Sequence, residues 1–170
     1  MMSEFLEEAD NILVQVYYEF AVFLFLVQRK SADKYLHNIM MDATRIHIRV
    51  LADFFSSKRN NPSDLLYSDF LINCPSIQID LPRHIRHFIN QSTAHLTKGR
   101  GKNVINDQEF RGIVSSIVSS IHGFTSQANR ANLKDEYKSL LDDEALKEIK
   151  AIVEKDLLSF LLLNNSSFSN

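Results

Sequence analysis

The sequence is poor in residues that turn or cross-link a chain. Its 170 residues include four glycines, three prolines, one cysteine and no tryptophan. Sandwiches and barrels need many tight turns, and therefore more glycine and proline, so this composition favours long helices. The single cysteine, Cys74, cannot form an internal disulfide. That fits a reducing compartment, and we predict a cytoplasmic protein.

Neither sign of charge dominates the chain. It has 19 Lys and Arg against 21 Asp and Glu, which gives a formal net charge of −2. This balance argues against a disordered acidic chain and against a strongly basic nucleic-acid packer. With 45% apolar residues, the length suits one hydrophobic core. We predict a single domain over residues 1–163, followed by a polar C-terminal tail over residues 164–170.

One long apolar run, from Ile12 to Val27, raises the question of a membrane span. A span needs about 20 apolar residues, whereas this run is shorter and contains Gln15 and Glu19. A helix that is apolar on all sides is typical of the central helix of a bundle. We therefore expect no association with a membrane.

Apolar residues recur at helical spacing along most of the chain and predict an all-α fold, a single up-and-down bundle of about five main helices. The expected main helices cover residues 3–30, 33–56, 80–98, 106–127 and 143 onward, with short helices at 64–71 and around Tyr137. In the helix over 33–56 we expect five residues to face the core, with His47 in the gap of the series: Leu36, Met40, Ala43, Val50 and Phe54.

The helix over 33–56 also contains the most informative polar cluster. Asp42, Arg45, Arg49 and Asp53 are three or four residues apart, so they share one side of the helix and alternate in sign. His47 lies on the inward side, where an imidazole must find hydrogen-bond partners. Two interpretations follow: a satisfied core histidine beside a surface series of ion pairs, or a catalytic or anion-binding pocket.

A second cluster ends the helix over 80–98. His95 borders the core near the C-terminal end of that helix, where backbone carbonyls favour a protonated imidazole. The loop that follows contains Lys98, Arg100 and Lys102, which we predict as phosphate- or anion-binding residues. We expect His47 and His95, from neighbouring helices, to meet at one polar pocket.

These clusters carry a resemblance to known families. Residues 45–55 (RIHIRVLADFF), 64–70 and 94–97 (AHLT) resemble motifs of an uncharacterised bacterial family of helical-bundle proteins, a likeness that covers residues 42–97. More distantly, polar residues ahead of a bundle histidine resemble the HEPN superfamily, which includes dimeric, metal-independent ribonucleases of toxin–antitoxin and phage-defence systems. The HEPN motif places an arginine four to six residues before the histidine, but here Asn90 stands at that distance from His95.

Two functions are compatible with these observations. The first is a non-catalytic interaction module, a homodimer in which Arg45, Asp53 and Asn90 line a buried polar pocket that fixes helix register. The alternative is a HEPN-like ribonuclease or RNA-binding protein. The resemblance then implies His95, His47 and Arg49 as catalytic residues.

We expect neither a cofactor nor a metal. His84 and His87 are three residues apart, yet no third ligand follows at the spacing of a zinc site. Phosphate-binding glycine loops, nucleophile elbows and HExxH motifs are also absent from the sequence.

Overall fold

The computed structural model describes residues 11–29, 31–74, 77, 79, 81–94, 106–138 and 142–166. Within these ranges there are seven helices and no strand, apart from an isolated antiparallel bridge between Leu71 and Leu133. The all-α bundle is thus confirmed. In the same ranges, no helix is both long enough and apolar enough to cross a membrane.

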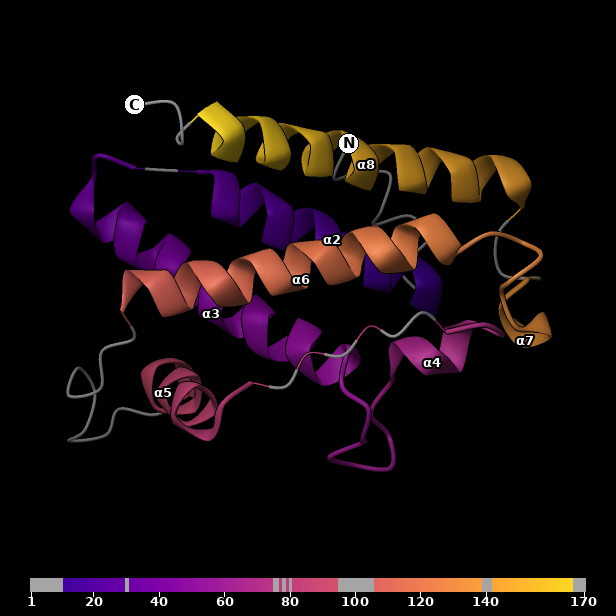
Figure 1. Ribbon diagram of the computed structural model, residues 1–170, viewed down its shortest axis with the longest axis horizontal. Helices are drawn as coiled ribbons and strands as arrows, with labels where there is room; N and C mark the ends of the chain where they lie inside the picture. Colours follow the sequence, from indigo (N-terminus) through magenta and orange to yellow (C-terminus); the bar gives the residue numbers. More distant parts are fainter. Residues whose placement is uncertain are drawn as a thin grey trace.

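The first two long helices form an antiparallel hairpin (Figure 1). They are α2 (Ile12–Gln28) and α3 (Lys34–Phe54). Each begins at a side-chain cap: Asn11 Oδ1 accepts a hydrogen bond from Leu13 N at 3.0 Å, and Asp33 Oδ1 accepts one from Leu36 N at 2.8 Å. These caps satisfy amide groups that the first helical turn leaves unpaired.

The last two long helices, α6 (Asp107–Gln127) and α8 (Asp143–Ser166), form the second hairpin. Asn106 and Glu109 cap α6 reciprocally, because each side chain accepts a hydrogen bond from the other's backbone amide. The helix α8 continues through Ser166, so residues 164–166, expected in the polar tail, are helical.

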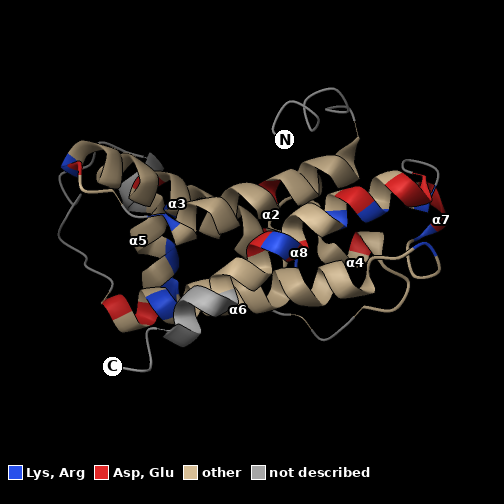
Figure 2. Ribbon diagram, turned by 90° about the horizontal axis from the view of Figure 1, so that it is seen from above, with Lys and Arg blue, Asp and Glu red and all other residues tan. Residues whose placement is uncertain are grey.

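The two hairpins pack together as a four-helix bundle in which α3 and α6 run in the same direction (Figure 1). This direction follows from the segment between them, which returns to the end where α3 began. The segment holds the short α4 (Tyr67–Phe70) and α5 (Arg83–Ala94). Helix α5 packs on α3 and lies across the bundle, seen end-on in Figure 1 and lengthwise in Figure 2. The short α7 (Asp135–Lys138) precedes α8.

Aromatic rings fill the core at the end of the bundle where α2 begins and α3 ends. The Phe124 ring lies within 5.6–6.2 Å of the rings of Tyr17, Phe20, Phe54 and Phe70, mostly edge to face. Such pairs add about 0.5–1.5 kcal/mol each to the burial of apolar area. This cluster anchors the C-terminal half of α3 to α2 and α6.

The predicted core face of α3 is only partly right. Phe54 is buried as expected, but Leu36 and Val50, also expected inside, are exposed. The other buried side chains of α3 include Thr44, Ile48 and Leu51, which centre about a quarter of a turn away from the predicted face. The error has a physical origin: α3 is apolar on more than one side, so periodicity alone cannot say which side the neighbouring helices cover.

Several predicted features lie outside the described residues. These are the start of the first helix, His95 and the basic loop with Lys98, Arg100 and Lys102.

Candidate functional site

The first polar contact of the site joins α2 to α3. His47 Nδ1 lies 2.7 Å from Glu19 Oε2, and both side chains are partly buried. The imidazole therefore has a partner, as expected for a satisfied core histidine. Its partner lies on α2, so His47 faces the α2 side of α3 and not the α5 side.

The second contact joins α3 to α5. Arg86 Nη1 donates to Asp53 Oδ1 at 2.8 Å, and the same oxygen accepts from Asn60 Nδ2 at 3.0 Å. Because two donors from different segments converge on one carboxylate, the end of α3, the following loop and α5 are held together here.

Arg45 makes the third contact. Its Nη1 donates to Asp42 Oδ1 at 2.8 Å, and its guanidinium carbon lies 5.0 Å from the centre of the Phe88 ring on α5. An arginine over an aromatic face is attracted to it by about 0.5–1 kcal/mol at a partly exposed site. Of the four residues expected in one series of ion pairs, Asp42 and Arg45 pair with each other and Asp53 pairs with Arg86. Arg49 is exposed, without an ion pair among the residues described.

Two buried polar atoms near the α3–α5 contact, Arg45 Nε and Asn90 Oδ1, have no hydrogen-bond partner within the described part of the chain. An unpaired buried polar group costs on the order of 1–3 kcal/mol. Two residues of the expected pocket, Arg45 and Asp53, contact α5, on which Asn90 also lies. His47, in contrast, faces α2. The predicted meeting of His47 with His95 stays a prediction, because His95 is not among the described residues.

A cavity of about 350 Å³ opens between α2, the end of α3 and residues 64–65. Three carboxylates reach it, and each is engaged elsewhere: Glu19 with His47, Asp53 with Arg86, and Asp64 with the backbone amides of residues 60 and 61. The rest of the wall is mainly apolar, and it consists of Ile12, Gln15, Val16, Phe20, Val50, Leu51, Phe54 and Leu65. Nowhere in the described ranges do three or more His, Cys, Asp or Glu side chains gather as metal ligands.

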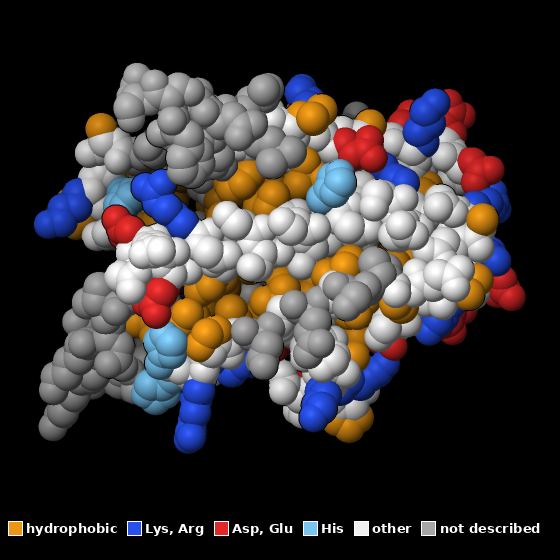
Figure 3. Space-filling view, in the orientation of Figure 1, with side chains coloured by type: hydrophobic (Ala, Val, Ile, Leu, Met, Phe, Trp, Pro, Cys, Tyr) orange, Lys and Arg blue, Asp and Glu red, His pale blue; other side chains and the backbone are white. Residues whose placement is uncertain are grey.

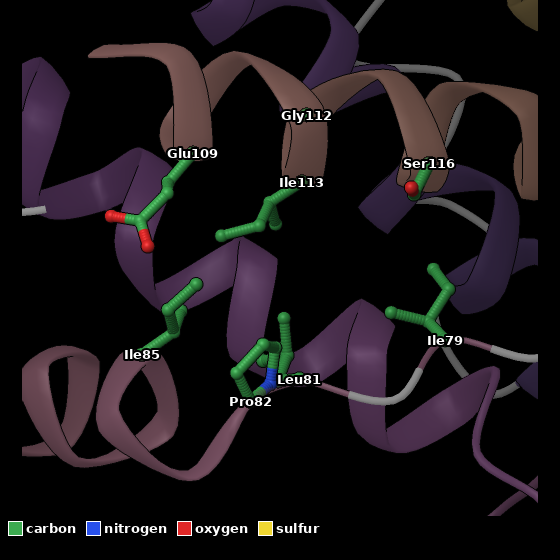
Figure 4. Close-up of a pocket in the computed structure, with 8 residues that line it drawn as sticks. All are labelled: Ile79, Leu81, Pro82, Ile85, Glu109, Gly112, Ile113 and Ser116. Atoms are coloured by element: carbon green, nitrogen blue, oxygen red, sulfur yellow. The ribbon is translucent and has the colours of Figure 1, made fainter. Parts of the chain in front are cut away.

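A second cavity, of about 370 Å³, lies between α6 and the segment that leads into α5 (Figure 4). Apolar side chains meet there beneath α6, as the space-filling view also shows (Figure 3). The eight residues that line it are Ile79, Leu81, Pro82, Ile85, Glu109, Gly112, Ile113 and Ser116. The only carboxylate in this wall is already bonded, because Glu109 Oε1 lies 3.1 Å from His84 Nε2 and Glu109 Oε2 caps α6.

The Cys74 side chain does not have the surroundings of a nucleophile. The thiol is free and donates weakly to the Leu71 carbonyl oxygen at 3.5 Å. Partial desolvation raises the pKa of Cys74, and this effect exceeds the lowering by Lys134, while Asp69 adds a still smaller increase. A raised pKa reduces the thiolate fraction at neutral pH, and the thiolate is the reactive form.

The feature that the sequence did not predict is an apolar surface on α3. Tyr35, Ile39, Ile46 and Val50 are 82%, 65%, 48% and 43% exposed. At 100° per residue they fall within a sector of about 60°, so they form one line along the helix, which we term the α3 stripe. Spacings of four, seven and four residues are the signal that could have revealed it.

Comparison of the chain with protein-family models, with curated proteins and with solved structures finds no match.

Proposed function

We propose that the protein is a non-catalytic interaction module that binds a protein partner through the α3 stripe. The observation that carries this proposal is the exposure of four large apolar side chains in one line. Single exposed apolar residues are common on protein surfaces, but contiguous apolar patches mark interaction sites. The stripe extends over about 22 Å of helix, since α-helical residues rise 1.5 Å each.

The polar contacts that α3 makes with its neighbouring helices support the same proposal. Glu19 with His47 and Asp53 with Arg86 fix α3 against α2 and α5 through side chains that pair with one another. Such pairs hold the register of a helix, and a helix of fixed register presents a defined surface. In this proposal the polar residues are positioning residues for α3.

The ribonuclease alternative needs a cation that is free to bind a phosphate near the catalytic histidine. Arg86 and Arg45 are each neutralised by a carboxylate at 2.8 Å, which disfavours that role for these two. Arg49 has no ion pair among the described residues, but it lies about 200° around α3 from His47, so the two side chains face opposite sides of the helix. We therefore expect RNA degradation by the purified protein to be unchanged by His95→Ala. An activity that His95→Ala abolishes would favour the ribonuclease.

A photo-crosslinking amino acid placed at residue 46 tests the interaction surface in cells. The matched control places it at residue 72, because Ile72 is 54% exposed and belongs to the segment after α4, where its backbone amide donates to Asn132 O. We expect a protein adduct from position 46 and none from position 72, and the adduct's mass gives the size of the partner. If neither position gives a protein adduct, or both give the same one, the stripe is not the interaction surface.

A further inference from the structure

The α3 stripe is self-complementary, and this property bears on the identity of its partner. The inference drawn from it rests on the proposed function. Its residues lie symmetrically about a point between residues 42 and 43, because their spacing of four, seven and four reads the same in both directions. Two copies of α3 in antiparallel contact therefore place Tyr35 opposite Val50 and Ile39 opposite Ile46, twice over. A two-fold symmetric interface requires this reciprocity of contacts.

A projecting side chain and an open cavity also lie at symmetric positions. Tyr35 projects from the part of α3 that lies beyond the core, whereas Val50 lines the cavity of about 350 Å³ between α2 and α3. In the antiparallel arrangement, Tyr35 of one copy reaches the mouth of the cavity in the other. Aromatic side chains that fill a partner's pocket are the residues that contribute most to protein interfaces.

The charge nearest the symmetry point does not oppose the antiparallel arrangement. The two copies of Asp42 approach each other there, but each is neutralised by its own Arg45 at 2.8 Å.

We infer that the partner of the α3 stripe is a second copy of this chain, bound with the two α3 helices antiparallel and with Tyr35 of each copy at the cavity beside Val50 of the other.

Disulfide cross-linking tests the register of this dimer. In a Cys74→Ser background, Ile39→Cys and Ile46→Cys are prepared separately and oxidised either alone or mixed. In the proposed dimer, residue 39 of one copy lies opposite residue 46 of the other copy. The two copies of residue 39 lie about 10 Å apart along the helix axis, which is beyond the reach of a disulfide. We expect cross-linked dimer from the mixture at a rate at least tenfold above either variant alone. Faster cross-linking of either variant alone would overturn the antiparallel register.

Sedimentation tests the dimer itself. We expect the wild-type chain at about 100 µM to sediment with twice its 19.6 kDa mass. Ile39→Arg should raise the dissociation constant of the dimer at least about 100-fold, because the interface contains residue 39 twice. The control variant, Ile72→Arg, introduces the same charge at another exposed isoleucine and should leave the dimer unchanged.

The outcomes separate this inference from the proposed function. A wild-type monomer whose residue 46 still forms an adduct of different mass in cells overturns the dimer and keeps the interaction module. A dimer that Ile39→Arg does not weaken uses another surface and also overturns the inference. A monomer without any adduct from residue 46 overturns both.

Discussion

The two halves of α3 differ sharply in what surrounds them. Ile48, Leu51 and Phe54 in the C-terminal half are buried by α2 and α6, whereas residues 34–39 in the N-terminal half are exposed on every side. Packing stabilises the C-terminal half, whereas among the described residues the N-terminal half is stabilised by the Asp33 cap and by its own backbone hydrogen bonds. An isolated helical segment of this length is marginal in water, so the N-terminal half of α3 is stabilised mainly by its continuity with the buried half.

The largest difference between the halves should appear on truncation of an aromatic side chain. Phe54→Ala removes a ring that contacts Phe20, Phe55, Phe70 and Phe124, and we expect it to lower the free energy of unfolding by about 3–5 kcal/mol. Urea denaturation measures this loss. Tyr35→Ala is the matched control in the exposed half, and both variants are measured in the Ile39→Arg background. For Tyr35→Ala we expect the free energy of unfolding to change by no more than about 0.5 kcal/mol. Equal losses from the two variants would contradict the comparison.

A smaller effect should come from the polar contact at the end of the buried half. Asp53→Ala removes the acceptor of Arg86 and Asn60, and we expect a loss of about 1–2 kcal/mol because Arg86 is left without its partner. Both side chains of the pair are partly exposed, so water limits the loss. Arg49→Ala on the exposed side of the same helix is the control. A loss from Asp53→Ala no greater than that from Arg49→Ala would show that this contact does not hold α3 to α5.

The smallest global effect should come from the cap of the exposed half. We expect Asp33→Ala in the Ile39→Arg background to accelerate amide hydrogen exchange over residues 34–39 and to change global stability by less than about 0.5 kcal/mol. Asn106→Ala removes the corresponding cap of α6, whose first turns pack in the bundle, and should cost about 1 kcal/mol globally. If Asp33→Ala lowers global stability as much as Asn106→Ala does, the two halves of α3 unfold as one unit.

Helix α6 shows how much the sequence could predict. Asn106 followed three residues later by Glu109 marks a helix start, and Ile113, Val114, Ile117, Val118, Ile121 and Phe124 recur on one side. The predicted span over 106–127 is confirmed, and the side on which these apolar residues recur is the buried side of α6. The face is unambiguous because the other side of this helix is polar or small, which leaves only one way to pack it.

The candidate site shows where such prediction ends. His47 and Asp53 were identified as notable, but their partners Glu19 and Arg86 lie 28 and 33 residues away on other helices. The sequence contains the charges without indicating which of them meet, because that depends on how α2 and α5 are oriented. The crosswise direction of α5 is set by packing between distant segments, which periodicity within one helix cannot report.

The shared direction of α3 and α6 has a consequence for how the chain folds. Each hairpin, α2 with α3 and α6 with α8, can form from contacts close in sequence. Joining them requires the long connection between Phe54 and Asp107 to close, which carries an entropic cost and slows folding. We therefore expect assembly of the two preformed hairpins to limit the folding rate.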